Sequence, residues 1–337
     1  MNKAITINDI AKIATVSKTT VSRFLNGKFE GMSEETRLRI QAVVEELDYR
    51  PNRQARALKA KYSSVIGITV TDISNPYNSR ILKGIMDRLK STEYRTIILD
   101  SDLCKTREHD NIEKLIDEQI DGLIIQPLAE SSHDYAEILK TKLPVVQVDR
   151  FVEPLVWPAV VSDNFIQSKN LGLRIKDKDY ERVIVLTPPM SESSPRKNRY
   201  KGLLNALIGG NVEIISITTP EIREIIAKDE KIWAELRNLL QDKKRTAIFA
   251  FNGALLYGAV KFLNDNLIAI PGNIGVVGYD DSALGELISP GITSIEQNPV
   301  EIGYRAVDIL LQQIIEGPQE LSGPVPVDSK LNIRKSL

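Results

Sequence analysis

From Ser64 onward, short apolar runs alternate with amphipathic segments, and this alternation constrains the fold more than any other feature of the sequence. The runs VIGITV, RTIILDSD, DGLIIQP and PVVQVDR are typical of buried strands and are separated by helical patterns. The alternation restarts at VIVLTPP (183–189) and continues through EIISI, AIFAFN and IGVVGYD. Strands that alternate with helices form a parallel sheet with helices on both faces. The sequence therefore predicts an α/β core of two doubly wound parallel-sheet subdomains.

The first 50 residues have a helical pattern and predict an all-α helix-turn-helix headpiece. Thr6, with Asp9 three residues later, forms a capping-box pattern for one helix, and Ser17 caps a second helix over 18–25. The break between them has the length of a helix-turn-helix turn. Ser33 caps a third helix, whose packing face is expected to include Leu38, Val43, Val44 and Leu47.

The polar face of the second helix is cationic and has no carboxylate, so it can lie against phosphates and reach base edges. The alternative is an ordinary surface helix pair. Residues 1–61 hold 12 Lys and Arg against 7 Asp and Glu, whereas the remainder holds 32 against 38. A basic head on an acidic body suits DNA contacted by the head alone. The expected DNA contacts are Thr6, Ser17, Lys18, Thr19, Thr20, Ser22, Arg23 and Asn26.

Residues 51–61 are either a linker or a hinge that becomes helical only when DNA and a second subunit hold it. The segment NRQARALK has good helix formers but is too short to be stable alone. As a hinge, it would insert Leu58 between base steps as an apolar wedge. The expected DNA contacts of this segment are Asn52, Ala55, Arg56, Leu58 and Lys59.

The composition argues against several classes of protein. One cysteine, Cys104, and two histidines give no intrachain disulfide and no plausible metal cluster, which fits a reducing cytoplasm. Neither a Walker-type loop nor a G-x-S-x-G motif is present, and no apolar run reaches about 18 residues. We therefore expect no cofactor, no metal, no catalytic residue and no membrane insertion.

The chain resembles the LacI/GalR family of transcriptional regulators from Ile5 to nearly its C-terminus. The segments that carry the resemblance are VSKTTVSRFLN, NRQARALK, VIGITVTDISNPYNSRILKGI, DGLII, VVGYDD and TSIEQNP. The resemblance implies a bacterial cytoplasmic repressor, not an enzyme, with a periplasmic-binding-protein-like core, which binds a palindromic operator as a homodimer. The expected domains are a headpiece (1–50), a hinge (51–61), a first core subdomain (62–161 with 292–321) and a second (162–291 with 322–337).

Two features depart from the common family pattern in the headpiece. Thr15 occupies a turn position where the family usually has glycine, which predicts a strained or reshaped turn. The loop from Asn26 to Ser33 is similar to that of the branch that represses 2-keto-3-deoxygluconate (KDG) utilisation genes.

An effector is expected between the subdomains, because ligands in such sheets bind beyond the carboxyl ends of the strands. Two arginines there predict an anionic effector such as a sugar acid, since a guanidinium holds a carboxylate with two parallel hydrogen bonds. For Arg150 the alternatives are an ion pair with Asp149 or Glu153, or a subunit contact. The expected effector residues are Asn75, Tyr77, Asn78, Gln126, Arg150, Ser193, Arg199, Asn252 and Asp280.

Effector binding is expected to close the cleft and lower the affinity for DNA, with corepression as the opposite sign. The alternatives to a sugar-acid effector are a neutral sugar or a corepressor protein. A solute-binding receptor of the periplasmic type shares the core architecture but is disfavoured by the basic headpiece. The C-terminal NIRKSL shows no leucine heptad, so a dimer is expected rather than a tetramer.

Overall fold

The computed structural model describes residues 5–49, 63–209, 213–218, 230–318 and 322–337. The chain divides into two compact units, Met1–Ser63 and Ser64–Leu337, which we describe separately. The predicted hinge at 51–61, with its five expected DNA contacts, lies outside the described residues.

Within its described residues, 5–49, the first unit contains three helices around a small apolar core. They are α1 (Ile7–Ile13), α2 (Lys18–Leu25) and α3 (Glu34–Glu46). Ile10, Val21 and Ile40 are completely buried and bring the three helices together. The expected packing role of Leu38 was wrong, because its side chain is 59% exposed. Two residues along a helix turn about 200°, so Ile40 faces the core while Leu38 faces away from it.

Thr15 has a φ of 52° in the turn between α1 and α2. This left-handed conformation costs an L-residue roughly 1–2 kcal/mol, and a β-branched side chain tolerates it poorly. We expect Thr15→Gly to stabilise the headpiece by up to about 1 kcal/mol, because the relieved strain exceeds the added entropy of the unfolded chain. Hydrogen exchange of the α1 and α2 amides in the full chain measures this. Thr19→Gly, at a helical position, is the control and should lower the protection of these amides by a similar amount. Lower protection in Thr15→Gly would show that the backbone at Thr15 is not strained.

The first sheet of the core has the strand order β11-β5-β4-β3-β1-β2, and all of its described pairings are parallel. Helices α5 and α14 cover one face, with Ile66, Ile85 and Leu310 in their core, and α6 and α7 cover the other. The elements are β1 (Val65–Val70), α5 (Pro76–Leu89), β2 (Arg95–Asp100), α6 (Lys105–Asp117), β3 (Gly122–Ile125), η1 (Ser132–Tyr135), α7 (Ala136–Leu139), β4 (Val145–Val148), β5 (Ala159–Ser162), α14 (Pro299–Glu316) and β11 (Val325–Val327).

The second sheet repeats this winding with the strand order β12-β10-β9-β8-β6-β7. Its edge strand β12 runs antiparallel to β10, and the other described pairings are parallel. Helices α8 and α9 cover one face, and α11 and α12 cover the other. The elements are α8 (Asn164–Lys176), β6 (Arg182–Thr187), η2 (Met190–Glu192), α9 (Ser194–Leu207), β7 (Glu213–Thr218), α11 (Glu230–Leu239), η3 (Leu240–Asp242), β8 (Thr246–Ala250), α12 (Gly253–Asp265), β9 (Ile274–Tyr279), α13 (Ala283–Leu287), β10 (Thr293–Glu296) and β12 (Lys330–Asn332).

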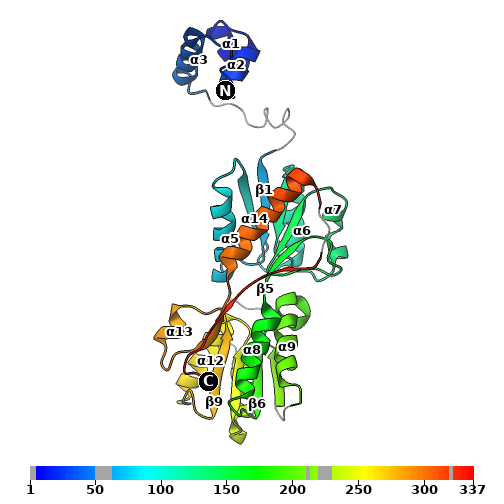
Figure 1. Cartoon of the computed structure of the whole chain (residues 1–337), viewed down its shortest axis with the longest axis vertical. Coiled ribbons are helices and arrows are strands. Elements are labelled where there is room, and N and C mark those ends of the chain that lie inside the picture. The colour runs from blue at the N-terminus through cyan, green and yellow to red at the C-terminus, as the bar shows by residue number, and fades with distance from the viewer. Residues whose placement is uncertain (1–4, 50–62, 210–212, 219–229, 319–321) are drawn as a thin grey trace. The chain divides into compact units, whose positions relative to one another are not determined.

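The strand pairing corrects two of the expected subdomain boundaries. We placed 292–321 in the first subdomain, but β10 pairs with β9 in the second sheet. We placed 322–337 in the second, but β11 pairs with β5 in the first sheet, and only then does the chain return as β12. The two strands have only four and three residues, so their sequences do not say which sheet they join, and only the pairing shows it. The crossovers therefore lie at Asp163, at Gln297–Asn298 and at Asp328–Ser329. Figure 1 shows the chain passing between the two lobes of the core.

Glycines permit close helix crossings on the two subdomains. Figure 1 shows α5 beside α14 in one lobe and α8 beside α9 in the other. A Cβ at Gly303 would lie 2.2 Å from the Ile81 carbonyl oxygen, and one at Gly202 would lie 2.2 Å from that of Phe165. Backbone atoms cannot rotate away, so these helix pairs pack at distances that only glycine allows.

Candidate DNA-binding and effector sites

Helix α2 presents the polar face that the sequence predicts. Val21 is completely buried beneath it, whereas Lys18, Thr19 and Arg23 are exposed. The Ser17 hydroxyl accepts a hydrogen bond from the Thr20 backbone N–H at 3.1 Å and so begins the helix. The exposed face carries two cations and no carboxylate, which suits a phosphate-lined groove.

Besides Ser17 and Thr20, which bond to each other, three more of the expected DNA contacts have partners within the headpiece. The Thr6 hydroxyl donates to the Asp9 carboxylate at 2.6 Å, and the Asn26 amide donates to the Ser22 carbonyl at 2.8 Å. The Arg23 guanidinium donates to the carbonyl of Glu30 in the following loop. All three side chains are exposed and can exchange these contacts for DNA.

In the first subdomain, polar side chains at the ends of three strands form one buried network. The Gln126 amide nitrogen lies 2.9 Å from both Asn78 Oδ1 and Asp149 Oδ2. Its oxygen accepts hydrogen bonds from the backbone N–H and the hydroxyl of Thr71. The network holds these expected effector residues at one edge of the sheet, as the strand-end rule requires.

Arg150 follows the same sheet edge and is only 8% exposed. Its Nε lies 3.9 Å from Asp149 Oδ2, which is the ion pair considered as an alternative for this residue. Desolvation raises the pKa of the Glu108 carboxyl, and the charge of Arg150 is a minor influence that opposes this rise. Arg150 is thus attached to the network through Asp149.

In the second subdomain, Arg199 on α9 is 6% exposed and surrounded by neutral acceptors. Its Nε donates to Asn164 Oδ1 at 2.7 Å, its Nη2 donates to Gln297 Oε1 at 2.9 Å, and its Nη1 donates to the Phe251 carbonyl. The guanidinium carbon lies 3.7 Å from the centre of the Tyr279 ring. Within the described part of the chain, no carboxylate forms an ion pair with Arg199.

Asp280 is connected to Arg199 through Gln297. Its Oδ1 accepts from the Gln297 amide at 2.7 Å, and its Oδ2 accepts from the Gly253 N–H at 2.9 Å. Asp280 has a φ of 64°, and Asp149 has a φ of 63° after the corresponding strand of the first sheet. Such left-handed non-glycine residues often occur at ligand sites, where surrounding contacts hold them.

Tyr77 of α5 is influenced by charged groups of both subdomains. Its hydroxyl lies 3.3 Å from Ser162 Oγ. Burial of the hydroxyl raises the pKa of Tyr77 well above its usual value, Asp149 adds to the rise, and Arg199 opposes it. The subdomains also meet where the Phe151 N–H donates to Ser194 Oγ at 3.0 Å. Charged groups from both sheets therefore act on one hydroxyl.

The remaining expected effector residues have structural roles at helix starts. Asn75 Oδ1 accepts from the Tyr77 N–H at 2.9 Å and begins α5, while Asn252 Oδ1 accepts from the Leu255 N–H at 2.8 Å and begins α12. Ser193 is buried at the start of α9. None of these three shares a hydrogen bond with the Gln126 or Arg199 networks within the described residues.

Sequence reasoning missed Asn164 and Gln297, which complete the Arg199 network. Gln297 directly follows β10 in the TSIEQNP segment, so the strand-end rule would have selected it.

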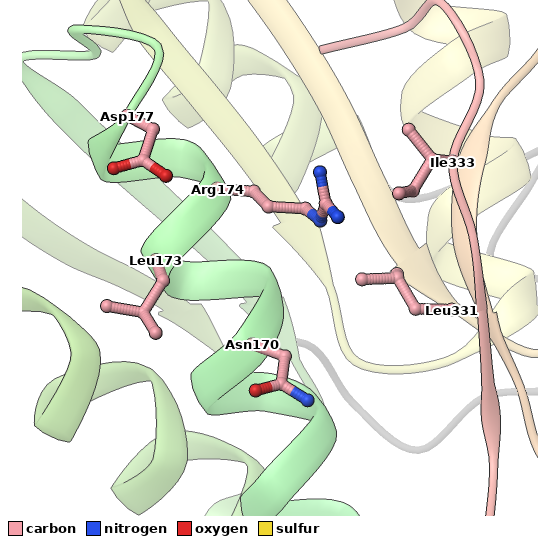
Figure 2. Close-up of a pocket in the computed structure, with 6 residues that line it drawn as sticks. All are labelled: Asn170, Leu173, Arg174, Asp177, Leu331 and Ile333. Atoms are coloured by element: carbon pink, nitrogen blue, oxygen red, sulfur yellow. The ribbon is translucent and has the colours of Figure 1, made fainter.

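Two hollows on the core, of about 480 and 410 Å³, lie away from these networks. Figure 2 shows the first, where Arg174 extends from α8 toward Leu331 and Ile333 near β12. Arg80 and Arg334 line the second. None of the expected effector residues lines either hollow. In the described ranges no metal-binding group of His, Cys, Asp and Glu occurs, and no helix is long and apolar enough to cross a membrane.

Glu108, on α6 of the first subdomain, is a completely buried carboxyl. It accepts hydrogen bonds from the Tyr135 hydroxyl at 2.8 Å and from the Leu128 N–H at 3.1 Å. Desolvation raises the pKa of Glu108 to about 7, against the partial opposition of these hydrogen bonds. Because the pKa of Glu108 is higher in the folded than in the unfolded chain, protonation of Glu108 stabilises the folded state. This stabilisation is complete below about pH 4.5 and is lost as pH rises through about 7.

We therefore expect Glu108→Gln to flatten the fall in unfolding free energy between pH 5 and pH 8, by up to about 3 kcal/mol. Chemical denaturation at a series of pH values measures the slope. Glu113→Gln, on the exposed side of the same helix, should leave the slope unchanged. An unaltered slope in Glu108→Gln would show that Glu108 is ionised throughout this range.

A basic helix-turn-helix unit joined to a two-lobed α/β core defines a DNA-binding transcriptional regulator rather than an enzyme. The family model for bacterial regulatory proteins of the lacI family matches residues 6–52, and that for a periplasmic binding protein-like domain matches 174–337. The HTH-type transcriptional regulator KdgR of Bacillus subtilis is 31% identical over 335 residues, which span 98% of this chain and 97% of that protein. The chain belongs to the LacI family.

Two further comparisons agree with this assignment. The ribose operon repressor of Haemophilus influenzae is 28% identical over 334 residues, which cover 98% of both chains. The crystal structure of the lac repressor dimer bound to operator and the anti-inducer ONPF has a TM-score of 0.82 at 22% identity and covers 99% of both chains, which supports the same fold.

Proposed function

We propose that this regulator is a homodimeric repressor whose affinity for a palindromic operator is lowered by a small anionic effector, such as the sugar acid 2-keto-3-deoxygluconate. The observation that carries the proposal is the buried guanidinium of Arg199. Three of its five N–H groups donate to neutral oxygens, and no described carboxylate neutralises it. A buried charge without an ionic partner is costly unless a ligand supplies one.

The surroundings of Arg199 suit a ligand with both a carboxylate and hydroxyl groups. The charges of Asp149, Arg199 and Asp280 all influence the pKa of the Tyr77 hydroxyl. Carboxylates accept hydrogen bonds from sugar hydroxyls. Arg150 supplies a second guanidinium, from the first subdomain, beside Asp149. These groups favour a sugar acid over a neutral sugar.

For the DNA, we propose that Lys18 and Arg23 on α2 enter the major groove and that the segment 51–61 acts as a hinge with Leu58 as its wedge. Two copies of the headpiece then require two half-sites related by two-fold symmetry. The expected subcellular site is the bacterial cytoplasm, where both DNA and sugar acids are present.

Footprinting on the DNA upstream of the chain's own gene tests this function. We expect a palindromic protected site that is lost on adding 2-keto-3-deoxygluconate and retained with ribose. Loss with ribose alone would favour a neutral-sugar effector. Protection that no small molecule changes would favour control by a corepressor protein, and absence of any footprint would contradict the repressor.

A further inference from the structure

We propose that Gln297 is a latch that holds the operator-binding arrangement of the core and that the effector displaces it from Arg199. The inference rests on the proposed function and deepens it by naming the residue that couples the effector site to movement between the subdomains. Gln297 is 5% exposed and bridges a cation and a carboxylate. Its oxygen accepts from Arg199 at 2.9 Å, and its nitrogen donates to Asp280 at 2.7 Å.

Gln297 lies in one of the three crossovers between the two sheets. It follows β10 of the second sheet and precedes Asn298, whose side chain accepts from the Glu301 N–H at 3.2 Å and begins α14 of the first subdomain. A rotation of one subdomain against the other must change the backbone here, since crossovers are the covalent connections between the lobes.

Arg199 also holds a second crossover. Its other partner, Asn164, follows Asp163 at the end of β5, and the Asn164 amide donates to the Ser162 carbonyl at 3.1 Å. Asp163 Oδ1 in turn accepts from the Ser329 N–H in the third crossover at 3.0 Å. One guanidinium therefore fixes two crossovers directly, and the third is attached to one of them.

The Arg199–Gln297 bond is the contact that an anion would replace. A carboxylate bound to a guanidinium forms stronger hydrogen bonds than a neutral amide oxygen does. The Phe251 carbonyl belongs to the backbone beyond β8 and cannot swing away, whereas the Gln297 side chain can rotate. Displacement of Gln297 also breaks its hydrogen bond to Asp280 and frees that carboxylate for a ligand hydroxyl.

The connection continues from Gln297 to the other half of the site. Helix α14 packs on α5 at a glycine crossing, where a Cβ at Gly84 would lie 2.0 Å from the Val300 carbonyl oxygen. Helix α5 carries Tyr77 and Asn78 near its start. Because this crossing is too tight to slide freely, a displacement of the start of α14 moves α5 as well.

The test compares Gln297→Leu with wild type in the full chain. Leu has a similar volume but cannot form the hydrogen bonds to Arg199 and Asp280, so the operator-binding arrangement loses its latch. We expect operator affinity without effector to fall by about 2- to 10-fold, which is the range of one or two net hydrogen bonds. Affinity for 2-keto-3-deoxygluconate should rise by a similar factor, because the effector no longer has to displace Gln297. Fluorescence anisotropy and isothermal titration calorimetry measure the two affinities.

Opposite changes in the two affinities separate a latch from a merely structural residue, whose loss would weaken both. Gln313→Leu, an equally buried glutamine on α14, is the matched control and should change neither. Gln297→Met replaces the Leu variant if that variant unfolds. Operator and effector affinities both within twofold of wild type, or both reduced, would overturn the latch.

If wild type fails to bind 2-keto-3-deoxygluconate, the proposed effector is wrong, and the latch is then judged on operator affinity alone. A 2- to 10-fold loss in Gln297→Leu, with Gln313→Leu unchanged, supports it in that case. Equal operator affinity in all three proteins overturns it.

Discussion

Replacing Arg199 with alanine is expected to weaken binding of the sugar-acid effector by about 30- to 4,000-fold and so to abolish its effect on operator binding at ordinary effector concentrations. Removing one member of a buried, hydrogen-bonded charge pair costs about 2–5 kcal/mol, and each 1.4 kcal/mol is tenfold. Operator affinity should fall by no more than about 10-fold, because Gln297 loses one hydrogen-bonding partner. Calorimetric titration with 2-keto-3-deoxygluconate and operator binding with and without it measure the two effects.

Arg196→Ala is the matched control for this variant. Arg196 lies on the same helix, is 7% exposed and donates to the Pro189 carbonyl at 2.9 Å, away from Gln297 and Asp280. It should retain a normal effector response. Arg199→Lys keeps the charge but not the two parallel hydrogen bonds, so its affinity should be intermediate. A normal dose response in Arg199→Ala would remove this residue from the site.

The local parts of the fold were predictable because they depend on short-range rules. The caps at Ser17 and Ser33 and the buried position of Val21 follow from helical spacing alone. Strand-helix alternation likewise predicted two doubly wound sheets, which the structure confirms. The conformation of Thr15 was also indicated, because the usual glycine at that position reports a need for positive φ.

The pairing of short strands was not predictable in the same way. β10 and β11 have four and three residues, and no local pattern says which sheet accepts them. The error at β10 placed Gln297 in the wrong subdomain and hid its contact with Arg199, 98 residues away in the chain. Likewise, Glu108 looks like an ordinary helix residue in the sequence, because its burial depends on the loop that carries Leu128. Long-range contacts of this kind decide which polar residues form a site.

Gly303→Ala is expected to destabilise the first subdomain by about 3 kcal/mol or more. A Cβ there would lie 2.2 Å from the Ile81 carbonyl oxygen and 2.9 Å from the Ile85 N–H nitrogen, both in the backbone of α5. The helices can accept it only by separating, which loosens the packing of the buried Ile81 and Ile85 side chains, and overpacking typically costs 1–3 kcal/mol, occasionally more. Chemical denaturation of the full chain measures the loss.

Ile315→Ala, at an 80% exposed position on α14, is the control for Gly303→Ala and should change the unfolding free energy by less than about 0.5 kcal/mol. If Gly303→Ala instead matched this control, α5 and α14 would not be in rigid contact. Displacement of Gln297 could then shift the start of α14 without moving Tyr77, and the effector would have to reach α5 by direct contact alone. A large loss in Gly303→Ala, together with weakened operator binding in the fraction that remains folded, therefore supports α14 as the element that carries the change between the two halves of the site.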